Sequence, residues 1–364
     1  MPTLLDRIQI GDLDLDNRVV MAPMTRSRAG ECDIPTDLNG QYYAQRATAG
    51  LIVSEATNVS RWSSAFERAP GIYTDAQVQG WKSIVNQIHD AGGKIFLQLW
   101  HSGRISSFAL LGGHEPLSPS GVNDDLEKLQ VWAQLANGAY TKIHATPSRA
   151  MTRDEIKHVV REYRLAAEHA WSVGFDGVEI HAANGYLPHQ FLSPTINRRD
   201  DEYGGSAENR ARFLKEIIDN VGEVMPVSRV GVRISPFAHY NNVRDPDPAS
   251  TYSYVAEMLE RFKVGYTHLA DTNGWAGAPD LPAILDIVRP RFSGTLIANG
   301  GISIEQAKQL LNKGQIDLVA FGRLYISNPD LVGRIRHDAP LSDSEPRGWY
   351  GGNEAGYTDY PPHA

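Results

Sequence analysis

Eight short runs of apolar, often β-branched residues recur along the chain, and this repeat constrains the fold more than any other feature. Each run has the length of a strand, and most are separated by a segment with the apolar period of a helix. Strands that alternate with helices predict a parallel sheet, and eight such strands close a (β/α)8 barrel. The runs are Arg18–Met21, Leu51–Ser54, Ile95–Leu99, Val178–Ile180, Val230–Ile234, Thr267–Ala270, Thr295–Ala298 and Leu318–Phe321.

Local start and stop signals support the helices between these strands. Thr152 and Glu155 have the spacing of a capping box, and Gly174 suits the left-handed residue that follows a helix. An open, doubly wound sheet is the alternative fold. Such a sheet usually begins with a glycine-rich turn, whereas the first strand here ends in APMTR. The barrel is therefore the predicted α/β fold.

Two segments depart from the strand–helix repeat. The residues LLDRIQIGDLDL alternate around Gly11 as in a β-hairpin, which we expect to plug the bottom of the barrel. The connection after the third strand, residues 101–150, is the longest one, and its length is typical of a lid or a binding loop. We therefore predict a single barrel domain over residues 1–364 with one lid insertion.

Composition excludes several classes of protein. The net charge of -8 argues against nucleic-acid and anionic-membrane partners, because proteins that bind them present a basic face. The single cysteine, Cys32, allows neither a disulfide within the chain nor a cysteine zinc site, and the histidines lack the spacing of metal ligands. Because the sequence shows neither a signal peptide nor a long apolar run, we expect a cytoplasmic protein. We expect a monomer or a homodimer.

Chemistry in such a barrel takes place at the carboxyl ends of the strands. The last two ends resemble a phosphate site, because their glycines let backbone N–H groups approach an anion and an arginine adds a guanidinium. Glycines that merely end strands are the alternative. The residues of these two ends are Asn299, Gly300, Gly301, Phe321, Gly322 and Arg323.

Gln98 and Arg233 lie inside apolar strands, where a polar side chain is costly without a partner. Arg233 either meets a carboxylate in the core or serves an anionic ligand, and Gln98 raises the same question for a neutral group. Two such residues in separate strands favour one planar, polar ligand.

The stretch HAANGY follows the fourth strand and supplies three possible hydrogen-bond donors, His181, Asn184 and Tyr186. It is either a polar turn or a proton-handling site. Metal-dependent hydrolysis and Schiff-base chemistry are disfavoured, because the strand ends lack His-x-His and lysine. A glycosidase needs two facing carboxylates, and we place Glu179 on the strand face opposite His181.

Long stretches of the chain resemble the old yellow enzyme family, whose members are flavoenzymes with an FMN-binding eight-stranded barrel. The resemblance implies non-covalent FMN as the cofactor and NADPH or NADH as the hydride donor. It runs from residue 17 to about residue 361. The motifs that carry it are NRVVMAPMTR, SEAT, LQLWHSGR, FDGVEIHAANGYLPHQFLSPTINRRDDEYGGSAENRARF, GVRISP, NGGI, VAFGRLYISNPDL and YGGNEAGYTDYP.

The resemblance implies a role for each candidate residue that would hold the cofactor. Thr25 would bond the flavin O4, as in the main branch of the family, and Gln98 and Arg233 would hold the pyrimidine side of the ring. The glycine-rich ends of the last two strands would hold the phosphate. The full set is Pro23, Met24, Thr25, Ala56, Gln98, Arg233, Asn299, Gly300, Gly301, Phe321, Gly322 and Arg323.

The implied reaction reduces the activated C=C bond of an α,β-unsaturated carbonyl compound, with nitro compounds and nitrate esters as further candidates. Hydride passes from flavin N5 to Cβ, His181 and Asn184 donate to the carbonyl oxygen, and Tyr186 gives a proton to Cα. The pocket around the substrate would comprise Thr25, Phe66, Trp100, His181, Asn184, Tyr186, Trp275 and Tyr350.

Two other functions remain as alternatives to an ene-reductase. One is a phosphate-ligand barrel that acts as a lyase or an isomerase, and the other is a barrel that binds a flavin or a phenol without catalysis. Residues 105–145 and 235–250 match the family weakly. We therefore expect these two segments to carry the substrate preference.

Overall fold

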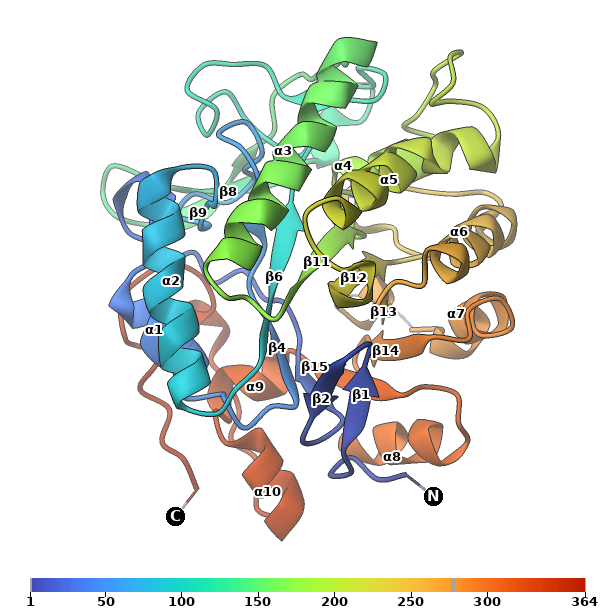
Figure 1. Cartoon of the computed structure of the whole chain (residues 1–364). Coiled ribbons are helices and arrows are strands. Elements are labelled where there is room, and N and C mark those ends of the chain that lie inside the picture. Colours follow the sequence, from blue (N-terminus) through green and yellow to red (C-terminus); the bar gives the residue numbers. More distant parts are fainter. Residues whose placement is uncertain (1, 276–278, 364) are drawn as a thin grey trace.

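The predicted strands form a closed parallel barrel in the computed structural model, which describes residues 2–275 and 279–363 (Figure 1). Pairing of β11 with β6 and of β15 with β3 closes the ring. The (β/α)8 barrel is confirmed. Its strands are β3 (Val19–Met21), β4 (Leu51–Val53), β6 (Ile95–Trp100), β11 (Gly177–Ala182), β12 (Val230–Ile234), β13 (Tyr266–Ala270), β14 (Thr295–Asn299) and β15 (Leu318–Phe321). The short β5 (Thr57–Asn58) also pairs with β6.

Helices join successive strands and cover the outside of the barrel (Figure 1). The predicted capping box is present, because the backbone N–H of Glu155 donates to the Thr152 hydroxyl at 3.2 Å. The helices are α1 (Asp37–Ala44), α2 (Asp75–Asp90), α3 (Arg153–Ser172), α4 (Leu187–Leu192), α5 (Ala207–Gly222), α6 (Pro248–Phe262), α7 (Leu281–Val288), α8 (Ile304–Asn312), α9 (Arg323–Ser327) and α10 (Leu331–His337).

An antiparallel hairpin, β1 (Ile8–Ile10) and β2 (Leu13–Leu15), lies at the lower end of the barrel in Figure 1. Its apolar side chains form one buried cluster with Phe96 and Tyr266 of the barrel strands. The turn needs Gly11, whose φ is +58° and whose missing Cβ would lie 2.7 Å from Cβ of Ser228. The hairpin therefore plugs the barrel as predicted.

Residues 101–150 form the predicted insertion between β6 and α3. Its main element is an antiparallel hairpin of β8 (Gln130–Gln134) and β9 (Tyr140–His144). Two shorter strands, β7 (Leu117–Ser118) and β10 (Arg149–Ala150), pair in parallel. A bridge between Phe66 and Trp132 joins this lid to the segment after β5. The lid therefore packs on a second loop rather than only on the barrel.

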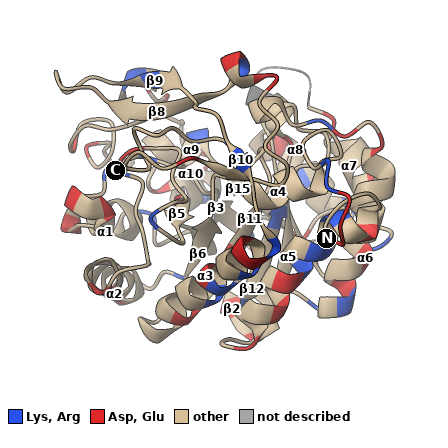
Figure 2. Cartoon of the chain, turned by 90° about the horizontal axis from the view of Figure 1, so that it is seen from above, with Lys and Arg blue, Asp and Glu red and all other residues tan. Residues whose placement is uncertain are grey.

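Charged residues lie mainly on the helices that surround the barrel, and both signs are interspersed there (Figure 2). The strands in the middle of this view are largely uncharged. Within the described residues, no helix combines the length and the apolar character that crossing a membrane requires.

Candidate functional site

His181 is buried near the carboxyl end of β11 and has a defined tautomer. The backbone N–H of Ala183 donates to its Nδ1 at 3.3 Å, so the neutral ring carries its hydrogen on Nε2. Burial, together with the nearby charge of Arg233, lowers the pKa of His181 well below its usual value. The imidazole is therefore neutral near pH 7 and acts as a hydrogen-bond donor.

Asn184 lies in the turn after β11 with a left-handed backbone, at a φ of 59°. Its backbone N–H donates to the Ser235 hydroxyl at 2.9 Å, and its carbonyl accepts a hydrogen bond from Asn241 at 2.9 Å. The buried side-chain Oδ1 has no hydrogen-bond partner among the described residues. The backbone is thus held on both sides, while the side-chain oxygen has no donor among the described residues.

Tyr186 is buried next to His181, and their ring centroids lie 5.0 Å apart in an edge-to-face contact. Trp100 makes a similar contact with Tyr186 at 5.1 Å. Burial raises the pKa of Tyr186 well above its usual value. The phenol therefore keeps its proton at neutral pH, which suits a general acid.

An aromatic wall continues from this pair into the lid. Phe66 lies 6.2 Å from Trp100 and 5.8 Å from Tyr350, measured between ring centroids. Trp132 of β8 stacks on Tyr350 at 4.7 Å. Ala56 and Tyr186 belong to the same apolar cluster. The structure thus brings Phe66, Trp100, Tyr186 and Tyr350 of the predicted pocket together, and it adds Trp132, which the sequence did not single out.

Glu179 faces the barrel interior, which corrects the expectation that it points away from His181. Residues two apart on a strand share a face, so Glu179 and His181 lie on the same side of β11. Gln98 donates to one carboxylate oxygen at 2.7 Å, and Tyr266 donates to the other at 3.0 Å. His268 Nδ1 also lies 2.8 Å from that second oxygen. The carboxylate therefore organises the polar interior, and its hydrogen-bond partners among the described residues are Gln98, Tyr266 and His268 rather than a second carboxylate.

Arg233 is buried beside this network, as expected for an arginine inside an apolar strand. Burial lowers the pKa of Arg233, and the charge of Glu179 acts in the opposite direction. Glu179 is therefore the carboxylate in the core that Arg233 was expected to meet in one of the two alternatives. One guanidinium nitrogen donates to Asn299 Oδ1 at 2.9 Å. The buried Nε has no partner among the described residues. A donor left over in this way fits a planar, polar ligand such as the FMN ring.

The glycine-rich ends of β14 and β15 lie side by side, because these strands pair with each other. Gly300 has a φ of +146°, and a Cβ there would lie 2.6 Å from Cβ of Asp271. Gly301 has a φ of +69° and is exposed, as is Arg323 at the start of α9. The backbone can therefore approach an anion here as the sequence suggested.

The end of β3 brings Pro23, Met24 and Thr25 to the same edge of the sheet, where all three are partly exposed. Arg26 follows and is buried. Its side chain donates to the carbonyl of Trp349 at 2.8 Å and to that of Gly356 at 2.7 Å, which anchors the C-terminal segment next to the pocket.

Four further residues bear on the predictions from the sequence. Glu55 accepts from the backbone N–H groups of Arg26 and Ser27, so it holds the turn after β3. The side chain of Trp275, a predicted pocket residue, lies outside the described residues. Trp132 and Asn241 could not be recognised, although the alternating pattern QVWAQ is typical of a strand and gave a weak signal for Trp132.

Comparisons with known proteins agree with this site. The sequence model of the NADH:flavin oxidoreductase / NADH oxidase family matches residues 3–342. The chain is 39% identical to 12-oxophytodienoate reductase 1 of Oryza sativa subsp. japonica, over 98% of this chain and 92% of that protein.

Two solved structures have the same fold over almost the whole chain. Morphinone reductase in complex with tetrahydroNAD is 43% identical, with a TM-score of 0.94 over 100% of this chain and 98% of the other. The old yellow enzyme homologue from Zymomonas mobilis is 39% identical, with a TM-score of 0.92 over 99% of both chains. The chain therefore belongs to the NADH:flavin oxidoreductase / NADH oxidase family and is an FMN-dependent ene-reductase of the old yellow enzyme type.

Proposed function

We propose that this enzyme reduces the activated C=C bond of α,β-unsaturated carbonyl compounds, and that His181, Asn184 and Tyr186 carry the chemistry of this chain. The observation that supports it most is the contact of a neutral imidazole with a protonated phenol, at 5.0 Å between ring centroids. The names of the relatives, reductases of 12-oxophytodienoate and of morphinone, also support a small organic substrate.

FMN, when bound, would supply the hydride for Cβ of the alkene, with NADPH or NADH as the source. Gln98 and Arg233 hold its ring in this proposal, and the positive charge of Arg233 offsets the negative charge of the reduced ring. Thr25 would hydrogen-bond the flavin O4. Gly301 and Arg323 hold the phosphate, together with their neighbours in the glycine-rich strand ends.

The substrate carbonyl is bound by two donors, Nε2–H of His181 and the side-chain amide of Asn184. Both stabilise the negative charge that develops on the oxygen, and removal of one such donor typically lowers the rate by about 10²–10³-fold. Tyr186 then gives its proton to Cα. Phe66, Trp100 and Tyr350 surround the substrate and exclude water.

A titration with phenol tests the two donors, because a phenolate oxygen resembles the enolate oxygen of the reaction. The FMN-loaded protein should bind phenol with a change in flavin absorbance, and His181→Ala should weaken this binding. His144→Ala is the matched control, because His144 is exposed on the lid hairpin. Binding of equal strength in His181→Ala and wild type would rule out the donor role.

A further inference from the structure

The loop between β12 and α6 contains two consecutive residues in the left-handed region, Asn241 with a φ of 58° and Asn242 with a φ of 53°. This conformation is disfavoured for residues with a side chain, and asparagine tolerates it better than most. Such strain persists only where the surrounding structure imposes it, and it is often found at functional sites. The contacts of the two side chains show what imposes it here.

Asn241 contacts the catalytic turn. Its side-chain Nδ2 donates to the backbone carbonyl of Asn184 at 2.9 Å. Gly185 leaves no space between the loop and the turn, because a Cβ there would lie 2.7 Å from Cβ of Asn241. Burial is the main influence on the pKa of Tyr186 and raises it, whereas a hydrogen bond with the Asn241 side chain acts in the opposite direction. The Asn241 amide thus holds the turn that carries Tyr186, two residues after Asn184.

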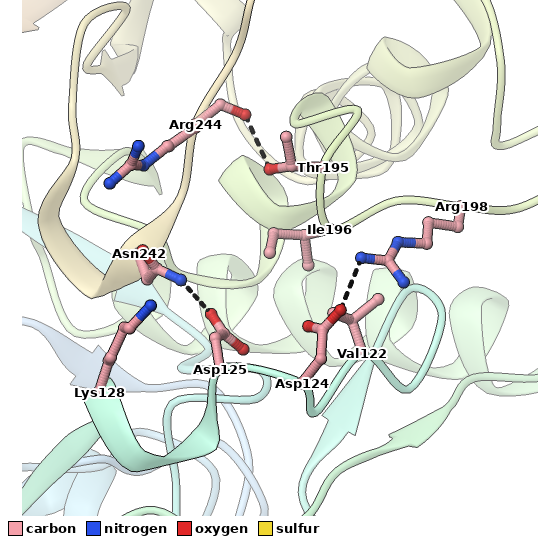
Figure 3. Close-up of a pocket in the computed structure, with 9 residues that line it drawn as sticks. All are labelled: Val122, Asp124, Asp125, Lys128, Thr195, Ile196, Arg198, Asn242 and Arg244. Atoms are coloured by element: carbon pink, nitrogen blue, oxygen red, sulfur yellow. Dashed lines mark hydrogen bonds and ion pairs between the residues drawn. The ribbon is translucent and has the colours of Figure 1, made fainter.

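Asn242 contacts the lid instead. Its side-chain amide donates to Asp125, which Arg104 holds through two hydrogen bonds of 2.7 Å and 2.6 Å. Arg104 is almost completely buried. Figure 3 shows the hydrogen bond between Asn242 and Asp125 at the wall of a pocket that is also lined by Lys128. Arg104, Asp125 and Asn242 therefore form a brace between the lid and this loop.

We propose that Asn241 is a positioning residue for Tyr186 and Asn184, and that the brace from the lid holds it in place. This inference rests on the proposed function, because it assigns proton donation to Tyr186. Without the Asn241 amide, the turn after β11 loses a hydrogen bond at Asn184, and Tyr186 on the same turn is held by one contact fewer. The Tyr186 hydroxyl is then positioned less precisely relative to Cα of the substrate. Reduction of the flavin by NADPH is unaffected.

Two substitutions test the role of Asn241 in the FMN-loaded full chain. Asn241→Gly suits the left-handed backbone and removes the amide, and Asn241→Asp keeps the size but replaces the N–H donor by an acceptor. Both should slow the reoxidation of the reduced enzyme by 2-cyclohexenone by about 10–100-fold, a part of the usual contribution of a general acid. Reduction of the bound flavin by NADPH should proceed at the wild-type rate in both.

The control in the same loop is His239→Ala, because the His239 side chain is exposed. It should reoxidise like wild type. Reoxidation at the wild-type rate in both Asn241 variants would overturn the positioning role, and so would equal slowing of the two half-reactions. A wild-type enzyme that the enone cannot reoxidise would instead show that the proposed function is wrong.

A double-mutant cycle tests the brace. Asp125→Asn removes the carboxylate charge that binds Arg104. It should slow reoxidation only in an enzyme that still has the Asn241 amide. In the Asn241→Gly background the same change should add nothing, because the group that the brace positions is gone. Additive effects of the two substitutions would show that the lid does not act through Asn241. Flavin content and phenol affinity, measured on each variant, identify any variant that has lost the folded site.

Discussion

Gln98 Nε2 lies 2.7 Å from Glu179 Oε1, a hydrogen bond that joins β6 to β11 inside the barrel. Burial acts to raise the pKa of Glu179, but His268, Arg233 and Gln98 together lower it below its usual value. The carboxylate is therefore charged at neutral pH although it is fully buried. It accepts a hydrogen bond from Gln98 and offsets the charge of Arg233. These are the two residues that are proposed to hold the flavin ring.

Glu179→Gln should destabilise the protein and reduce its content of FMN. The substitution removes the charge that offsets the buried Arg233, and a buried charge left without compensation typically costs about 3–5 kcal/mol. Urea unfolding of the FMN-saturated protein measures the loss. Glu168→Gln, on the exposed face of α3, should unfold like wild type. A free energy of unfolding for Glu179→Gln equal to that of Glu168→Gln would contradict the structural role of the carboxylate.

Acidification should destabilise the fold below about pH 6.5, the usual pKa of histidine. Burial lowers the pKa of His101 and of His189 to about 3. Between these two pH values the histidines bind protons in the unfolded chain but not in the folded chain. Their contribution to stability is therefore fully present above about pH 6.5 and is lost toward pH 3. Each histidine contributes a slope of about 1.4 kcal/mol per pH unit.

The substitution His101→Asn separates the contribution of His101 to the pH dependence of stability from the contributions of other titrating groups. Burial raises the pKa of Glu162 to about 7, and that shift acts in the opposite direction over part of the range. In His101→Asn, the amide oxygen can accept the hydrogen bond from the Gly103 N–H in place of Nδ1, without titrating. Urea unfolding between pH 7.5 and pH 5.5 should show a shallower loss for His101→Asn than for wild type. Parallel curves would show that His101 is not kept neutral.

Trp132→Ala should weaken substrate binding more than it slows the chemistry. Trp132 stacks on Tyr350 and contacts Phe66, and aromatic pairs of this kind contribute about 0.5–1.5 kcal/mol beyond their buried area. We therefore expect KM for 2-cyclohexenone to rise about 2–10-fold with little change in kcat. Trp171→Ala, on the outer face of α3, is the matched control. A fall in kcat at constant KM would argue against a wall that only shapes the pocket.

Gly300→Ala should reduce FMN binding and stability together. The backbone at a φ of +146° is accessible essentially to glycine alone, and the added Cβ would collide with Asp271. Strain and overpacking together predict a loss of about 2 kcal/mol or more. Gly333→Ala is the control, because a Cβ at that position in α10 meets no atom within 4 Å. Normal flavin content and stability in Gly300→Ala would show that the close approach is not required.

Local patterns were sufficient to predict the barrel, since each strand and each capping box is encoded within a few residues. The polar residues at the strand ends could also be predicted, because a parallel barrel brings these ends to one edge. The prediction for the strand face of Glu179 was wrong, although the alternation along a strand places Glu179 on the same face as His181. Its partners Tyr266 and His268 lie on another strand, so their contact required the barrel to be closed.

The loops could not be predicted, because their conformation depends on contacts between distant segments. Trp132 contacts Tyr350 in the C-terminal segment, which Arg26 anchors through the carbonyl of Trp349. Asn241 reaches Asn184 across 57 positions of the sequence. Neither contact has a local pattern, and both lie in or next to the segments that match the family weakly.

The central claim is that Tyr186 delivers the proton to the alkene. The most direct test is the anaerobic reoxidation of the pre-reduced enzyme by 2-cyclohexenone, followed in a single turnover for wild type and Tyr186→Phe. The account predicts that the substitution slows this step by about 10²–10⁴-fold, the usual contribution of a general acid, while NADPH still reduces the bound flavin at the wild-type rate. Reoxidation of Tyr186→Phe at the wild-type rate would contradict it.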